Sequence, residues 1–135
     1  MIIGIGTDIC DIRRIEDSIE KFGERFIKKI FTVFEQNYCE SKSASGSAYA
    51  KRFAAKEAIA KALATDSSGA LPWTDVEVRN DASGRPVAKL YGKAVERLES
   101  IVPDGKANVH LSLSDDYPYA VAYAIIETQE MESQS

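Results

Sequence analysis

The sequence predicts an α+β fold in one domain, with a small antiparallel sheet packed against helices. Strand-like and helix-like segments intermix without the regular strand–helix–strand repeat of a parallel sheet. Near the C-terminus, residues 109–125 contain two strand-like segments joined by a turn, which is typical of an antiparallel hairpin. A chain of 135 residues is the size of one ordinary domain, and it contains no internal repeat.

Composition narrows the class of protein. Hydrophobic residues make up 44% of the chain and charged residues 28%, as in a soluble globular protein. The net charge of −4 argues against general nucleic-acid binding. No segment is long enough to cross a membrane, and the apolar start lacks a basic leader, so it predicts a strand instead of a signal peptide. Two cysteines without metal-ligand spacing indicate packing residues of a reducing compartment, and we expect a cytoplasmic protein.

The expected elements follow in chain order from periodicity and breaker residues. We expect strands at residues 2–8, 76–78, 87–90, 109–114 and 119–125, and helices at residues 12–30, 33–41, 48–64 and 93–101. Residues 41–47 and 65–72 are predicted loops, residues 81–86 a turn, and residues 128–135 a frayed polar tail.

The first strand has two different faces. Residues 2–9 place isoleucines and a threonine on one side, and Gly4, Gly6 and Asp8 on the other. Glycines on one face leave room for another backbone or a ligand. Asp8 is either a turn residue or a free functional carboxylate. Asp11 is the better N-cap for the following helix, which leaves Asp8 available.

The predicted first helix, residues 12–30, has an apolar stripe and a basic one. The apolar stripe consists of Ile12, Ile15, Ile19, Phe22, Phe26 and Ile30. At about 100° per residue, a roughly opposite line is formed by Arg14, Lys21, Arg25 and Lys28. These basic residues form either a solvated face or a docking strip for an acidic partner.

Glu57 is the unusual residue of the predicted helix 48–64. It lies on a largely apolar face, where a carboxylate is costly unless it is paired or bound to a metal. It is either an ordinary i,i+4 partner of Lys61 or a functional group. His110, the single histidine, lies on the polar face of the predicted strand 109–114. It also has two interpretations, a surface residue or a catalyst.

Three motifs together resemble holo-acyl-carrier-protein synthase, the small bacterial type of 4′-phosphopantetheinyl transferase. They are residues 4–9 with Asp8, residues 52–62 with Glu57 and Lys61, and the strand that begins at His110. Their order and spacing match from residue 1 to about residue 127, which implies a transferase domain over 1–127 followed by the tail 128–135. The resemblance is strengthened by the turn at residues 83–86 and by the segment 31–35.

The resemblance implies transfer of 4′-phosphopantetheine from coenzyme A to a serine of an acidic apo-acyl carrier protein, in support of fatty acid biosynthesis. It implies Mg²⁺ as cofactor, held by Asp8 and Glu57, with Lys61 as a third catalytic residue. It also implies a homotrimer with sites between subunits, and carrier docking on the basic line. The resemblance further implies that coenzyme A is bound by the residues at the family's coenzyme-binding positions, which in this chain are Arg52, Lys56, Ser83, Gly84, Arg85, Pro86, Ser112, Leu113 and Ser114.

Two departures from the family pattern leave alternatives open. Asp115 stands where the family often has histidine, and Ala64 stands where glycine is common. A metal-dependent phosphohydrolase would use the same carboxylates with water as nucleophile. A binding module without turnover would use the same surfaces. The general base, the preferred carrier protein, the preferred metal and the tolerance for acyl-coenzyme A are not determined by the sequence.

Overall fold

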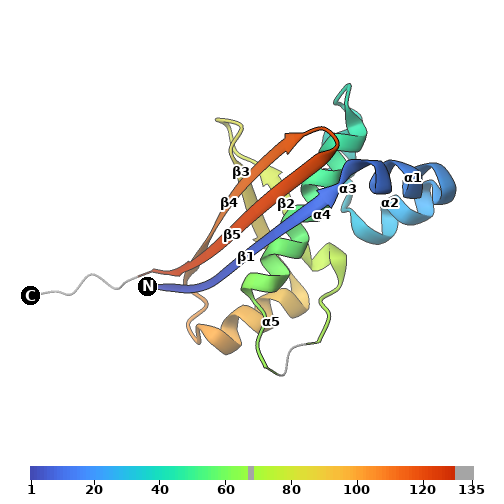
Figure 1. The fold of residues 1–135 in the computed structure, drawn as a ribbon. Coiled ribbons are helices and arrows are strands. Elements are labelled where there is room, and N and C mark those ends of the chain that lie inside the picture. Colours follow the sequence, from blue (N-terminus) through green and yellow to red (C-terminus); the bar gives the residue numbers. More distant parts are fainter. Residues whose placement is uncertain (67–68, 130–135) are drawn as a thin grey trace, which may run out of the picture.

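The computed structural model describes residues 1–66 and 69–129, and it confirms the α+β class. Helices pack on one side of a three-stranded antiparallel sheet, and two further strands form a separate sheet (Figure 1). The elements are, in order, β1 (Ile2–Asp11), α1 (Ile12–Phe22), α2 (Glu24–Ile30), α3 (Val33–Glu40), α4 (Ser45–Ala62), η1 (Trp73–Asp75), β2 (Val76–Asn80), β3 (Pro86–Leu90), α5 (Gly92–Ile101), β4 (Ala107–Asp116) and β5 (Tyr119–Thr128).

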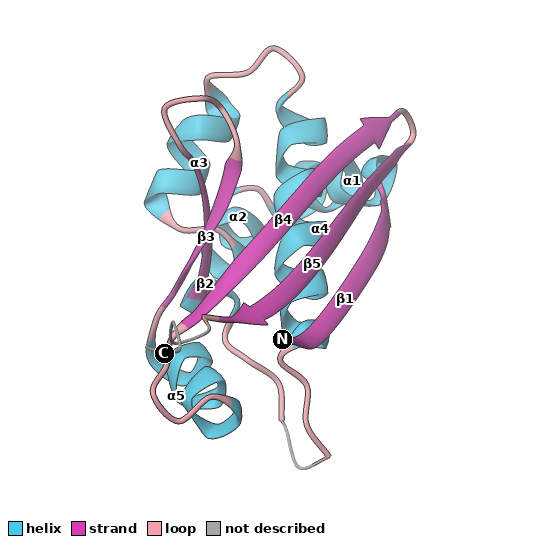
Figure 2. Cartoon of the chain, turned by 90° about the vertical axis from the view of Figure 1, so that its left-hand side faces the viewer, coloured by secondary structure: helices cyan, strands magenta, loops and turns pink. Residues whose placement is uncertain are grey.

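The larger sheet has the order β1-β5-β4, and both pairings are antiparallel. The predicted C-terminal hairpin is therefore confirmed, and the N-terminal strand adds to its free side. Helix α4 lies across one face of this sheet, and β2 and β3 form the second sheet beside it (Figure 2). No helix in the described part of the chain combines the length and the apolar character that a membrane span requires.

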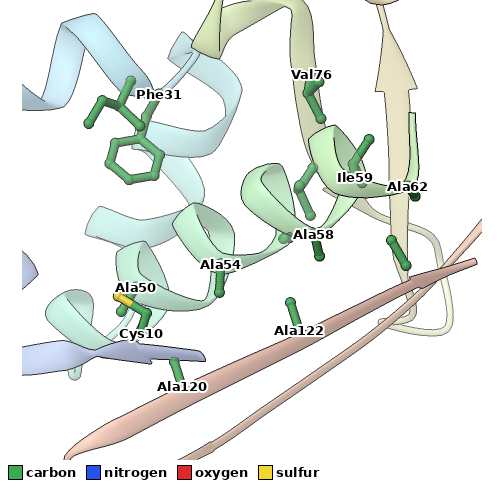
Figure 3. Close-up of a cluster of buried hydrophobic side chains, with 14 of the residues drawn as sticks. Cys10, Phe31, Ala50, Ala54, Ala58, Ile59, Ala62, Val76, Ala120 and Ala122 are labelled. Carbon is green, nitrogen blue, oxygen red and sulfur yellow. The ribbon is translucent and has the colours of Figure 1, made fainter. Parts of the chain in front are cut away.

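The contact between α4 and the sheet is built from very small residues. Ala54 and Ala58 of α4 face Ala120 and Ala122 of β5, and all four are fully buried (Figure 3). On β1, a Cβ atom placed on Gly6 would lie 1.8 Å from the carbonyl oxygen of Ala58. The sequence prediction that the glycines admit another backbone is correct, and the backbone is that of α4.

The predicted helix over residues 12–30 is wrong in one respect, because it is two helices. Gly23 separates α1 from α2 with φ 55° and ψ −132°, a conformation that favours glycine. Its N–H group donates to the carbonyl oxygen of Ile19 and ends α1. Phe22 was expected in the apolar stripe, but it is 56% exposed.

Other boundaries differ by a few residues. Strand β1 continues to Asp11, whose side chain caps α1 by accepting from the backbone N–H of Arg13, as predicted. Helix α4 begins at Ser45 and takes up part of the predicted loop. Strand β5 includes Thr128, while residues 130–135 of the predicted tail lie outside the described residues.

Candidate active site

The close approach of β1 to α4 brings two sequence-distant carboxylates to one place. Asp8 projects from the glycine face of β1, and Glu57 and Lys61 project from successive turns of α4. The Nζ atom of Lys61 lies 3.2 Å from Oδ1 of Asp8 and 2.9 Å from the carbonyl oxygen of Thr7. The structure therefore gathers the three residues that the sequence singled out as catalytic.

The environment of Glu57 disfavours its negative charge. The pKa of Glu57 is raised, first by burial and then by the carboxylate of Asp8, while the Lys61 ammonium acts in the opposite direction. Among the described side chains, Lys61 pairs with Asp8 and not with Glu57, so the ordinary i,i+4 pair is not formed. A cation between the two carboxylates would relieve their repulsion.

A cavity of about 380 Å³, which we call the carboxylate cavity, opens beside Asp8 and Glu57. Its aromatic wall consists of Phe53 and Trp73, whose rings stack with centroids 5.1 Å apart and an interplanar angle of 26°. Arg14 of α1 also lines it. The sequence analysis placed Arg14 on the basic line and gave no role to Trp73. The sequence feature that could have indicated Trp73 is that it is the single tryptophan and directly follows a predicted loop.

Within residues 1–66 and 69–129, no group of three or more histidine, cysteine or acidic side chains is arranged to hold a metal. Two carboxylates are nevertheless the donor set that suits Mg²⁺, which takes one or two of them and completes its shell with phosphates and waters. Cys10 lines the same cavity, but burial raises the pKa of its thiol to about 11. A neutral thiol is a poor nucleophile, so the cavity favours direct transfer over a covalent intermediate.

Arg52 faces away from the carboxylate cavity, toward β2. Its side chain is buried, and Nη2 donates to Oδ1 of Asn80 at 2.5 Å. The guanidinium also lies 3.8 Å from the centre of the Tyr38 ring. Asn80 in turn donates from Nδ2 to the carbonyl oxygen of Gly84. The structure thus connects Arg52 to the turn at residues 83–86, the two features that the resemblance grouped together.

That turn is organised by Asp81. Its Oδ1 atom accepts from the backbone N–H groups of Ser83 and Arg85, at 2.9 and 3.0 Å. Gly84 has φ 87°, which a residue with a side chain adopts at a cost. Together with Pro86, Arg85 lines a second cavity of about 570 Å³ that does not include Asp8 or Glu57.

The expected coenzyme-binding strand residues lie on β4, an edge strand. Ser112 and Ser114 are exposed on the sheet face opposite α4, and Leu113 points to the core side. The next residue, Asp115, forms an ion pair with Lys51 of α4 at 3.0 Å. A single chain therefore does not bring this strand to the carboxylate cavity.

Lys56 requires a correction. The resemblance placed it among the coenzyme-binding residues, but its side chain is only 1% exposed and its ammonium points into the protein. There it contacts Glu35 and two backbone carbonyls, and these three acceptors match its three donors. No donor of Lys56 is left for a coenzyme.

The four basic residues of the docking strip are all exposed, but the break at Gly23 divides them between two helices. Arg14 and Lys21 belong to α1, and Arg25 and Lys28 belong to α2. The prediction of one straight line at helical spacing is therefore wrong. The structure retains exposed basic residues on both helices, of which Lys28 pairs with Glu24 at 3.2 Å; we refer to the four residues together as the basic surface.

His110 lies on β4 at the second cavity, away from the carboxylates. Its Nε2 atom is 3.2 Å from Oε1 of Glu127, and both side chains are about half exposed.

We expect His110→Ala to lower kcat/KM by less than about tenfold, because a general base contributes about a hundredfold or more. The measurement is the pH–rate profile. Selective loss of one limb of that profile in the variant would identify His110 as the base after all.

The chain is similar in sequence and in fold to proteins of one known family. A sequence model of the 4′-phosphopantetheinyl transferase superfamily matches residues 4–122. The chain is 54% identical over 128 residues to the holo-[acyl-carrier-protein] synthase of Methylorubrum populi, an alignment that covers 94% of each chain. The crystal structure of holo-[acyl-carrier-protein] synthase from Neisseria meningitidis has a TM-score of 0.80 and 37% identity, covering 95% of this chain and all of that one.

A second similar structure includes a ligand. It is the holo-(acyl-carrier-protein) synthase of Bacillus anthracis in complex with CoA (3′,5′-ADP), with a TM-score of 0.74, 34% identity and coverage of 96% of this chain and 99% of that one. The likeness therefore extends over nearly the whole chain in both sequence and fold. This chain belongs to the 4′-phosphopantetheinyl transferase superfamily and, within it, to the holo-[acyl-carrier-protein] synthase family.

Proposed function

We propose that this chain transfers the 4′-phosphopantetheine group of coenzyme A to a serine of apo-acyl carrier protein. The products are holo-acyl carrier protein and adenosine 3′,5′-bisphosphate, and the reaction supports fatty acid biosynthesis in the cytoplasm. The observation that carries the proposal is that Asp8 and Glu57 line one cavity and that Lys61 pairs with Asp8. The relatives named above and the coenzyme complex among them support it.

The reaction suits this cavity chemically. A serine hydroxyl attacks the phosphorus that carries the pantetheine group, and a new P–O bond forms. The bond to the second phosphate breaks, adenosine 3′,5′-bisphosphate leaves, and the hydroxyl proton is released to solvent. Such transfer depends on positioning and on stabilisation of charge. Lys61 supplies one positive charge beside Asp8. The carboxylates Asp8 and Glu57 would hold Mg²⁺, which supplies further neutralisation of the phosphates when it is bound.

The same proposal includes a homotrimer with sites between subunits. On the sheet face opposite α4, strands β1 and β5 carry apolar side chains that the described residues leave uncovered: Ile5, Ile9, Tyr119 and Tyr123 are each between 49 and 66% exposed. Moreover, one chain divides the expected site between two cavities, with Asp8 at one and Arg85 at the other. If this sheet face of one subunit packed against a neighbouring subunit, the cavity with Asp8 and the cavity with Arg85 could come together between the two subunits. Sedimentation equilibrium of the purified chain measures the mass of the assembly.

One assay separates the three candidate activities. The purified chain is incubated with coenzyme A, Mg²⁺ and apo carrier protein, and the intact mass of the carrier is measured. We expect a mass increase equal to one phosphopantetheine group, with release of adenosine 3′,5′-bisphosphate. Hydrolysis of a nucleotide without a change in carrier mass would indicate a phosphohydrolase instead. Binding without either product would indicate a module that lacks turnover.

The basic surface predicts how the carrier protein docks. Lys21 and Arg25 are exposed, on opposite sides of the break at Gly23, and neither lines the carboxylate cavity. We expect Lys21→Glu with Arg25→Glu to raise the KM for carrier protein about tenfold or more while the KM for coenzyme A stays constant, because exposed charges steer an acidic partner. Steady-state kinetics with each substrate varied measures both constants.

The salt dependence provides the control for this prediction. Exposed charges are screened over about 8–10 Å at moderate ionic strength, so salt should weaken carrier binding in the parent and much less in the double variant. The variant Lys93→Glu with Lys106→Glu makes the same charge change at exposed positions of α5 and the following loop. Equal KM values for the two double variants would remove α1 and α2 from the docking surface.

A further inference from the structure

A buried ion pair lies directly behind the catalytic face of α4. Oε1 of Glu35, on α3, is 2.8 Å from Nζ of Lys56, on α4, and the two side chains are 0 and 1% exposed. Lys56 is the residue that precedes Glu57. The pair belongs to the core, and the transfer chemistry described above does not use it.

The polar groups of this pair contact several parts of the fold. The Lys56 ammonium also donates to the carbonyl oxygen of Trp73 at 3.0 Å and to that of Val76. The Glu35 carboxylate also accepts from the backbone N–H groups of Thr32 and Val78, at 2.9 and 2.8 Å. Two side chains thus connect the start of α3, the middle of α4, η1 and β2.

The contact to Trp73 relates this network to the active site. The Trp73 ring stacks on Phe53 and lines the carboxylate cavity together with Glu57. It also lines a smaller cavity of about 230 Å³, together with Lys56, Glu57 and Val76. The position of the indole therefore shapes both spaces next to the catalytic carboxylate. Its backbone is held by the ammonium of the residue adjacent to that carboxylate.

Stability alone is a weak reason for such a pair. Removing both charges from water is costly, and a buried ion pair is often no more stabilising than apolar residues of the same size. The Lys56 ammonium makes directional hydrogen bonds to the carbonyl groups of Trp73 and Val76 next to the cavity, and an apolar side chain could not make them.

We propose that Glu35 and Lys56 are positioning residues for the transfer reaction, holding the Trp73 wall of the carboxylate cavity against α4 beside Glu57. They act through Trp73 and touch neither substrate. The inference rests on the proposed transfer activity, because it concerns the site at which that reaction takes place. It also explains why Lys56, unlike its neighbour, faces inward.

The test uses a double variant that leaves no unpaired charge inside. Glu35→Gln with Lys56→Met removes the ion pair and both contacts to the carbonyls of Trp73 and Val76, at unchanged net charge. Because Trp73 is the single tryptophan of the chain, its fluorescence reports the position of the wall. The matched control is Lys93→Met with Glu99→Gln, which makes the same exchange at exposed positions of α5.

We expect the double variant, assayed well below its unfolding midpoint, to lose about ten- to a hundredfold in kcat/KM, as small displacements at reacting centres do. Its Trp73 emission should shift to longer wavelength, since the indole becomes more exposed to water. The control should match the parent in both. A folded double variant with parental kcat/KM and parental emission would overturn the proposal and leave the pair a core element only.

A second variant covers the case in which the double variant fails to fold. Lys56→Arg keeps the buried charge, but its planar guanidinium does not reproduce the three contacts of the ammonium. We expect a folded protein with lowered kcat/KM and altered Trp73 emission, and parental values in both would again overturn the inference. If the parent itself transfers no phosphopantetheine, the proposed function fails, while the emission of Trp73 still decides whether the pair holds the wall.

Discussion

Asp8→Asn and Glu57→Gln should each slow phosphopantetheine transfer by about a thousandfold while the protein remains folded. This loss corresponds to about 4 kcal/mol of transition-state stabilisation. The physical reason is that each variant removes one of the two carboxylates that would hold the metal beside the reacting phosphates. Transfer is measured by carrier mass at saturating Mg²⁺ and coenzyme A.

The expectation that these variants fold rests on the environment of each residue. Because the pKa of Glu57 is raised in the folded protein, its ionised form contributes unfavourably to folding at neutral pH, and that contribution disappears as the pH falls below the unfolded pKa. Glu57→Gln should therefore not lower the free energy of unfolding. The side chain of Lys61 is already 55% exposed in the parent, so water can solvate its ammonium when the Asp8 carboxylate is lost.

The controls are Glu96→Gln and Glu99→Gln, which neutralise exposed carboxylates of α5. Both should transfer at the parental rate. If Asp8→Asn or Glu57→Gln also retained near-parental turnover, that residue would have no place in the metal site. If turnover were lost together with folding, the loss would reflect structure, so thermal unfolding is measured for every variant.

Gly6→Ala should destabilise the protein more than any other single methyl group added to it. The new Cβ atom would lie 1.8 Å from the carbonyl oxygen of Ala58 and 2.9 Å from the backbone nitrogen of Ala62. Both atoms belong to the backbone of α4, so no side-chain rotation relieves the clash. We expect a loss of about 3 kcal/mol or more in the free energy of unfolding, at the upper end of what overpacking produces.

Urea denaturation measures this loss, with Gly69→Ala as the control. A Cβ atom on Gly69 would meet no atom of the described residues within 4 Å, so that variant should unfold within about 0.5 kcal/mol of the parent. Any Gly6→Ala protein that still folds should also transfer slowly, because displacing β1 separates Asp8 from Glu57. A Gly6→Ala protein with the parental midpoint would contradict the close approach of β1 to α4.

The sequence was informative wherever a local pattern has one physical solution. Alternation identified the hairpin of β4 and β5, and Asp11 was identified as the cap of α1. The two glycines of β1 indicated close approach of another backbone or a ligand. Each of these inferences depends on the nearest few residues, whose conformational preferences act regardless of the rest of the fold.

Local patterns failed where a distant contact or a single backbone angle decided the outcome. The spacing of residues 12–30 fits one helix, but Gly23 adopts φ 55° and divides it, so the basic residues do not form one line. Lys56 has the sequence context of a ligand-binding lysine. Its inward direction is set by Glu35 and by the carbonyl of Trp73, which lie far from it in the chain.

By itself, the sequence determined the fold class, most elements and the identity of Asp8, Glu57 and Lys61 as the candidate catalytic residues. Only the tertiary structure decided that Lys61 pairs with Asp8, that Trp73 and Phe53 form the wall beside them, and that Lys56 belongs to the core. The physical reason is that a side chain on a helix or strand has a periodic direction, whereas its partners come from segments that meet only when the chain is packed.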